Sequence, residues 1–172
     1  MSYDNNKLYF TEDCLIQTNN CFKDSTKHNY FEIEALNLED DAQFHFGLAL
    51  NIKDNNFKDS SILLNIYSKK IELYGKPIEW INFPTIDEGD VIGCLYHSSP
   101  RNEAMFTYNG EEIITLKFGF NKAKLFPTIY GIKGCFINYN FGREPFHYQP
   151  ANYYNYGVVK PSTKSEEPPN YS

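Results

Sequence analysis

The side chains that could carry out catalysis are scattered along this 172-residue chain. No two histidines stand in the HExxH or HxxE spacing of zinc ligands, and no GxSxG sequence marks a nucleophilic serine. Cys94 lies in an apolar run, where a thiol packs instead of reacting. Glu39–Asp41 lacks the ligand spacing of a calcium loop and is typical of a solvated turn. We therefore predict no enzymatic activity, no metal and no cofactor. The histidines are His28, His45, His97 and His147.

One short motif has a clear binding chemistry, the sequence Pro168-Pro169-Asn170-Tyr171 near the end of the chain. Consecutive prolines favour a polyproline II backbone, so little conformational entropy is lost on docking. An aromatic-lined groove of a WW domain packs such prolines, and the tyrosine supplies a second anchor. A motif with three fixed positions also arises by chance, but its place favours function. We predict that Pro168, Pro169 and Tyr171 bind a WW domain.

The motif lies in a segment whose composition differs from that of the rest of the chain. Residues 160–172, KPSTKSEEPPNYS, contain three of the nine prolines and no aliphatic side chain. Such a segment cannot bury enough apolar surface to offset its ordering entropy. We predict a folded unit over residues 1–159 and a disordered tail over residues 160–172.

Composition and charge limit the class of the protein. The 14 tyrosines and 14 phenylalanines favour β-structure, since aromatic side chains suit a pleated surface. The net charge of −6 and the lack of a basic cluster argue against nucleic acid as a partner. Four cysteines without a CxxC pair, and no signal segment, favour reduced thiols in the cytoplasm. No apolar run reaches 18 residues, so no transmembrane segment is expected.

Short runs rich in aromatic and branched residues alternate with turn signals along the folded unit. Residues 30–36 alternate apolar and acidic side chains, so one face of that strand is expected to be buried and the other solvated. Asn109-Gly110 is a strong hairpin signal because both residues accept positive φ. Only Asn121–Lys124 suggests a helical turn. We predict an all-β sandwich of two antiparallel sheets. The expected strands are 8–10, 14–16, 30–36, 44–50, 62–67, 91–96, 105–108, 113–118, 125–129 and 136–141.

The core of this sandwich should be formed by the inward-facing residues of the strands. Gly93 is included because a missing side chain allows two sheets to approach closely. The predicted core residues are Phe31, Ile33, Phe46, Leu48, Val91, Gly93, Phe106, Phe126, Ile129 and Phe141.

The order of several phrases between about Asn29 and Tyr148 resembles the SPRY domain, a β-sandwich that binds other proteins. They are YFEI at 30–33, GLA at 47–49, GDVIGC at 89–94, FTYNG at 106–110, LFPT at 125–128 and NFG at 140–142. Each is weak alone, and the order and spacing make them specific. The resemblance implies a recognition module.

From Tyr74 onward the chain is similar to one subgroup, the fungal endosomal and vacuolar SPRY adaptors. The shared phrases are GFN at 119–121, PAN at 150–152 and the PPxY motif. The resemblance implies an adaptor that binds unknown protein cargo through SPRY loops and recruits a WW-domain HECT ubiquitin ligase for ubiquitination and sorting. The alternative is a plain SPRY binding subunit of a larger complex. Those adaptors carry an N-terminal transmembrane helix that has no counterpart here, so we expect a cytoplasmic protein or one peripheral to endosomal or vacuolar membranes.

The loops are the expected site of cargo binding, because rigid scaffolds carry variable function there. The candidate segments are 51–59, 67–80 and 98–102. Trp80 is the only tryptophan, and Trp, Tyr and Arg are common at binding hot spots. Trp80 could instead close the end of the core. We predict that Trp80, Tyr74 and Arg101 line one cargo-peptide groove.

Overall fold

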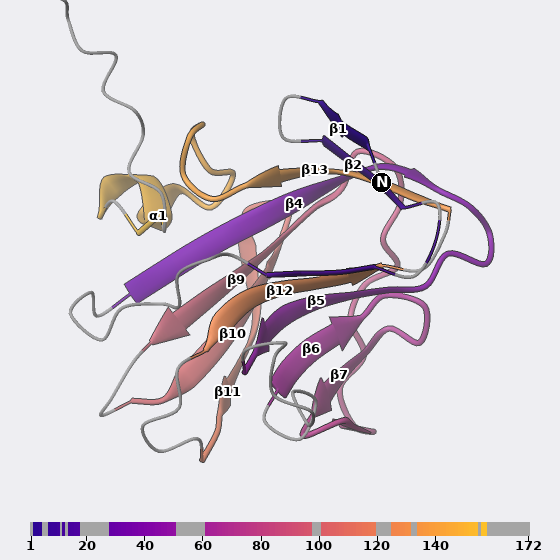
Figure 1. Cartoon of the computed structure of the whole chain (residues 1–172). Helices are drawn as coiled ribbons and strands as arrows, with labels where there is room; N and C mark the ends of the chain where they lie inside the picture. The colour runs from indigo at the N-terminus through magenta and orange to yellow at the C-terminus, as the bar shows by residue number, and fades with distance from the viewer. Residues whose placement is uncertain are drawn as a thin grey trace, which may run out of the picture.

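Two antiparallel β-sheets pack face to face in the computed structural model of this chain (Figure 1). The structure describes residues 2–4, 7–10, 12, 14–17, 28–50, 61–97, 101–119, 125–131, 134–154 and 156–157. The predicted all-β sandwich is confirmed. The predicted boundary at residue 159, like the predicted tail and the loop 51–59, lies outside the described residues, so the domain division stays a prediction.

The larger sheet has seven strands in the order β1-β2-β13-β4-β9-β10-β11. Its long strand β4 runs beside β13 on one side and β9 on the other. The strands are β1 (Ser2–Asp4), β2 (Lys7–Phe10), β4 (His28–Leu38), β9 (Val91–His97), β10 (Glu103–Tyr108), β11 (Glu111–Lys117) and β13 (Cys135–Asn140).

The smaller sheet has six strands in the order β3-β12-β5-β6-β7-β8. The strands are β3 (Cys14–Gln17), β5 (Phe44–Ala49), β6 (Ser61–Asn65), β7 (Lys70–Leu73), β8 (Lys76–Pro77) and β12 (Phe126–Gly131). The segment 67–80, predicted to be a loop, therefore contains two strands. These strands were not predicted, because β7 has four residues and β8 has two, which is too short for a clear alternating pattern.

One short helix, α1 (Gln149–Tyr153), lies outside the sandwich (Figure 1). Pro150 stands in its first turn, where the missing N–H has no helical partner to lose. This helix was not predicted, since a single turn shows no helical period. The helical turn predicted at 121–124 lies outside the described residues.

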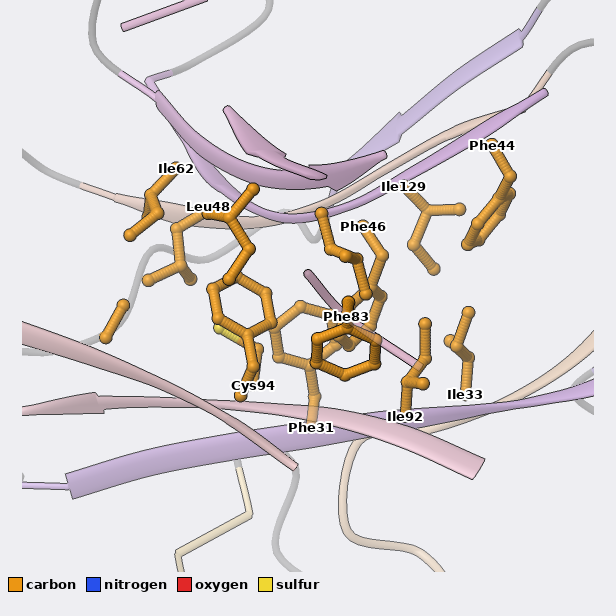
Figure 2. Packing of buried hydrophobic residues seen from close by; sticks show 14 of the residues in the cluster. Phe31, Ile33, Phe44, Phe46, Leu48, Ile62, Phe83, Ile92, Cys94 and Ile129 are labelled. Atoms are coloured by element: carbon orange, nitrogen blue, oxygen red, sulfur yellow. The ribbon is translucent and has the colours of Figure 1, made fainter. Parts of the chain in front are cut away.

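The space between the sheets is filled by apolar side chains from both layers (Figure 2). Phe31, Ile33, Phe46, Leu48, Phe106 and Ile129 belong to this buried cluster, as predicted. Phe126 is also buried, and Phe141 is partly buried against the cluster. Gly93 is buried, but not because the two sheets approach each other closely there, as was expected. A Cβ at this position would collide with the Tyr30 ring on the outer face of the sheet, so Gly93 makes room for that ring rather than for the facing sheet.

Two of the segments that resemble the SPRY domain, 89–94 and 106–110, are joined by hydrogen bonds at a turn. Asn109 and Gly110 have φ values of 49° and 84°, which fits the predicted tight hairpin between β10 and β11. The Asn109 side chain accepts a hydrogen bond from the Val91 N–H at 2.8 Å and donates one to Asp90 at 2.9 Å. Tyr108 donates its hydroxyl to the same carboxylate at 2.9 Å. Partial burial opposes ionisation of Asp90, but the hydrogen bonds from Asn109, Asp87 and Tyr108 outweigh it and lower the pKa.

Candidate binding site

Trp80 lies in the turn after β8, and 77% of its surface is exposed. It therefore does not close the end of the core. Its flanking residue Ile81 is buried, which fixes the turn against the sandwich. Lys70 also holds the turn, because its ammonium group donates to the Glu79 carbonyl oxygen at 2.6 Å and to the Asn82 side chain at 2.9 Å. An exposed indole on an anchored turn can serve as a rigid contact for a partner.

Tyr74 and Arg101 both lie near the last residues of β11. Tyr74 has a φ of 55° in the turn between β7 and β8, and its hydroxyl accepts a hydrogen bond from the Gly119 N–H at 3.1 Å. Arg101 is exposed, and the carbonyl of the next residue, Asn102, accepts from the Phe118 N–H at 3.0 Å. The structure therefore brings these two predicted residues to the same edge of the sandwich.

Trp80 and Tyr74 lie at opposite ends of the β7–β8 hairpin. The pairing of Ile78 with Ile71, and of Phe83 with Lys69, returns the chain to the start of β7 by the time it reaches Trp80. From Lys70 to Tyr74 the strand rises by about 13 Å. Another exposed aromatic residue, Tyr67, lies in the turn before β7 and is 62% exposed. Trp80 and Tyr74 could share one extended partner, but they do not form a compact pocket.

A second candidate region lies on the outer face of the seven-stranded sheet. There the segment from Phe146 to α1 covers the sheet and forms a small second core, which we call the outer cluster. It contains Tyr30 of β4, Leu95 of β9 and Met105 of β10 from the sheet, with Phe146, Tyr148 and Ala151 from the covering segment. The Tyr30 ring meets the Phe146 ring edge to face, with centroids 4.8 Å apart.

Glu32 lies beside the outer cluster and is only 3% exposed. Its carboxylate accepts a hydrogen bond from the His147 N–H at 2.9 Å and another from the Tyr30 hydroxyl at 3.0 Å. The His147 Nδ1 atom lies 3.1 Å from the same carboxylate. Thr107 shares a 2.9 Å hydrogen bond with the Tyr30 hydroxyl. Burial of this carboxylate is tolerated because several donors replace the water that it loses.

Burial of the Tyr30 ring disfavours ionisation of its phenol. Desolvation, and after it the negative charge of Glu32, raise the pKa of Tyr30 far above its usual value. The pKa of Tyr148 is also raised, by burial and by a 2.6 Å hydrogen bond that its hydroxyl donates to Glu112. Both hydroxyls therefore act as fixed hydrogen-bond donors at neutral pH.

A polar pocket of about 480 Å³ opens next to Glu32. Its floor is the outer face of β4 and β13, where Glu34 pairs with Asn138 and Glu32 pairs with Asn140. Its lining is Glu32, Glu34, Val91, Asn138, Tyr139, Asn140, Arg143, Glu144, Pro145 and His147. Carboxylates, amides and a guanidinium in one hollow can hydrogen-bond to the backbone and polar side chains of a peptide.

This pocket was not predicted from the sequence, and a solvated face was expected for Glu32. That expectation was wrong, because residues 146–151 cover the outer face. The alternating pattern of residues 30–36 shows which side chains share a face, but not what lies over that face. A signal was present in the apolar pair Phe146 and Tyr148, which sequence analysis placed after the last strand and left unassigned. Pro168, Pro169 and Tyr171 lie outside the described residues, so their role stays a prediction.

Comparisons with known proteins show sequence similarity to fungal proteins and a fold shared with solved structures. No protein-family model matches the chain. It is 25% identical over 167 residues to the protein ssh4 of Neurospora crassa, a match that covers 94% of this chain and 32% of that protein. It is 27% identical over 169 residues to a SPRY domain-containing protein of Schizosaccharomyces pombe, covering 94% and 42%. The chain thus spans about a third of the length of the Ssh4 proteins that it matches.

Solved structures show the same fold at low sequence identity. The SPRY domain of human HERC1 superposes with a TM-score of 0.65 at 12% identity, covering 81% of this chain and 90% of that domain. Another human SPRY domain superposes with a TM-score of 0.62 at 15% identity, covering 81% and 93%. Fold and sequence agree: the chain has the SPRY fold and is similar in sequence to the fungal Ssh4 proteins.

Proposed function

We propose that this protein is an adaptor whose SPRY domain binds a cargo protein and whose PPNY motif recruits a WW-domain HECT ubiquitin ligase. Ubiquitination and sorting of the bound cargo would follow. The observation that carries the proposal is the combination of a SPRY domain related to Ssh4 with Pro168, Pro169 and Tyr171 in the sequence that follows it. Binding in two places, rather than catalysis, is the activity that this combination favours.

Three surfaces of the domain are candidates for contact with the cargo. The first is the turn of Trp80, the second is the edge that carries Tyr74 and Arg101, and the third is the polar pocket beside Arg143. Trp80 is the strongest candidate for the principal anchor, since an exposed tryptophan loses much apolar surface to a partner. Tyr74 and Arg101 would contact a more distant part of the same cargo.

The proposed place of action is the cytoplasmic side of endosomal or vacuolar membranes, reached through the cargo. In the part of the chain that the structure describes, no helix has the length and apolar character needed to cross a membrane. The relationship to Ssh4 favours a sorting context.

Calorimetry with a recombinant WW domain from a HECT ubiquitin ligase tests the tail. We expect the full chain to bind with roughly micromolar affinity or weaker, because a four-residue epitope buries little surface. Tyr171→Ala should remove most of the binding, because it deletes one of the two anchors. Asn170→Ala is the matched control and should leave the affinity unchanged. Equal affinity of the wild type and Tyr171→Ala would refute ligase recruitment.

Affinity purification from cells separates the two binding roles. Tyr171→Ala should lose the ligase and keep the cargo, whereas Trp80→Ala should keep the ligase and lose cargo. Arg101→Ala and Arg143→Ala test the other two surfaces. The alternative function, a plain SPRY subunit of a larger complex, predicts that Tyr171→Ala changes nothing in the purified material. That result would favour the alternative over the adaptor.

A further inference from the structure

Two exposed tyrosines lie at the C-terminal end of α1, the last helical residue Tyr153 and the C-cap Tyr154. Tyr153 is 83% exposed and Tyr154 is 61% exposed, while Ala151 of the same helix is buried in the outer cluster. Together with Pro150 these tyrosines line a shallow hollow of about 620 Å³, which we call the tyrosine shelf. Since Ala151 anchors the helix in the outer cluster, the exposed aromatic pair is free to bind a partner.

The shelf is held rigidly. The Asn152 side chain accepts a 2.7 Å hydrogen bond from the Phe146 N–H and donates a 2.8 Å one to the Phe146 carbonyl oxygen, which ties α1 to the loop before it. The Tyr153 and Tyr154 rings stand edge to face, with centroids 4.8 Å apart at 88°. The Tyr154 ring also stacks on Tyr156 at 5.4 Å and 15°. These ring contacts restrict the side-chain rotamers, and rotamers already restricted in the free protein lower the entropic cost of binding.

The chemistry of the shelf selects a class of ligand. Its lining residues are Gln149, Pro150, Asn152, Tyr153 and Tyr154, and none of them carries a charge at neutral pH. A strongly charged ligand would find no counter-charge in this lining. Two tyrosine faces at a right angle suit proline rings, which pack on aromatic side chains in an extended polyproline II conformation. The fitting ligand is a short proline-rich segment.

The chain supplies such a segment next to the shelf. Gly157 forms a bridge with Tyr30, the Tyr30 N–H donates to the Tyr156 carbonyl oxygen at 2.9 Å, and the Tyr156 N–H donates to the Ala151 carbonyl oxygen at 2.9 Å, so Gly157 is held close to α1. From Gly157 to Pro168 a fully extended chain spans roughly 36–40 Å, which is ample to bring Pro168 and Pro169 back to the shelf. We propose that the tyrosine shelf binds Pro168-Pro169 of the same molecule and thereby competes with a WW domain for the PPNY motif.

The expected strength of this competition follows from the tether. A short linker gives the tail an effective concentration on the order of millimolar at the shelf. An open two-tyrosine surface binding two prolines should have a dissociation constant of about the same size. The WW domain would then find about half of the tail occupied, and its apparent affinity would fall about twofold. This inference rests on the proposed function for its biological meaning, but the docking itself can be tested without a WW domain.

The first test compares the affinity of a recombinant WW domain for a peptide of residues 158–172 and for the full chain. The peptide should bind about twofold more tightly. In the full chain, the double variant Tyr153→Ala and Tyr154→Ala should regain the affinity of the peptide. Tyr67→Ala, which removes an equally exposed tyrosine far along the chain, should not. Full-chain affinity equal to that of the peptide would overturn the proposal, and tighter binding would show that the shelf contacts the WW domain instead.

The second test uses NMR of the full chain without any partner. Pro168→Ala combined with Pro169→Ala should shift the ring signals of Tyr153 and Tyr154 and leave those of Tyr67 unchanged. Unchanged shelf signals would overturn docking whatever the WW measurement shows. Shifts that grow with protein concentration would assign the occupant to the tail of a second copy, which also overturns the intramolecular form. If the peptide fails to bind the WW domain while the shelf signals still shift, ligase recruitment fails and docking stands.

Discussion

The inner face of the seven-stranded sheet meets the six-stranded sheet through apolar side chains, whereas its outer face meets the segment 146–151 through aromatic, hydroxyl and carboxylate groups. Neighbouring residues of one strand take part in both environments. Phe31 of β4 packs between the sheets, and the adjacent Glu32 accepts hydrogen bonds on the outside. The stability of the inner face depends on the volume and shape of its apolar side chains. The stability of the outer face depends on the presence of every hydrogen-bond partner.

The largest effect is expected from a truncation on the inner face. Phe106 is fully buried in the cluster between the sheets. Phe106→Ala should lower the free energy of unfolding by about 3–5 kcal/mol, because it removes apolar contacts and leaves a cavity. Urea denaturation measures the loss. Ile113→Ala on the edge strand β11, where the side chain is 38% exposed, is the control and should cost far less. Similar losses for both would contradict the assignment of Phe106 to the core.

The second prediction tests the outer face through its buried carboxylate. Glu32→Ala removes the acceptor of the His147 N–H, and it leaves the Tyr30 hydroxyl with Thr107 as its hydrogen-bond partner. Loss of hydrogen bonds to a buried charged group should cost about 2–4 kcal/mol. Glu34→Ala, two residues along the same face but only partly buried, should cost little. The comparison uses urea denaturation, and equal costs for the two glutamates would show that the outer face is not sealed.

The third prediction tests why Gly93 is needed. It could make room for the Tyr30 ring on the outer face or for the facing sheet on the inner face. Gly93→Ala places a methyl group against the Tyr30 ring on the outer face. Overpacking of this kind typically costs about 1–3 kcal/mol. Combining Gly93→Ala with Tyr30→Phe should cost less than the sum of the single changes, because the phenol oxygen that meets the methyl group is gone. Strict additivity in the double-mutant cycle would point back to the inner face.

Much of the inner face was predictable from sequence, because alternation and turn residues are local signals. Phe31, Phe46 and Phe106 were placed correctly for this reason. The cover of the outer face was not predictable, since His147 reaches Glu32 across 115 residues of chain and the intervening signals do not encode that contact. The single groove expected for Trp80 and Tyr74 also depended on reading 67–80 as a loop. Two short strands in that segment separate the residues.

The outer face should also respond to alkaline pH. The folded-state pKa of Tyr30 is raised, so the folded state keeps a proton that the unfolded state releases above about pH 10. The contribution of Tyr30 to stability is therefore fully present below about pH 10 and is lost as the pH rises above it. For one such group the free energy of unfolding falls by about 1.4 kcal/mol per pH unit. Tyr30→Phe should make the fall shallower without abolishing it, because Tyr148 and the buried Cys94 thiol also have raised pKa values. Tyr67→Phe is the control, and denaturation at pH 8 to 11 gives the slopes.

The smallest stability effect is expected at Trp80, which contrasts with both buried faces. Its side chain is 77% exposed, and its turn is held by Lys70 and by the buried Ile81 rather than by the indole itself. Trp80→Ala should change the free energy of unfolding by less than about 0.5 kcal/mol. Its effect on cargo should be large by comparison, since a ring that contributes nothing to folding keeps its apolar surface for a partner. Denaturation and cargo pull-down on the same variant provide the test. A marked loss of stability would mean that Trp80 belongs to the fold, whereas unchanged stability together with unchanged cargo would assign cargo binding to the edge of Arg101 or to the polar pocket.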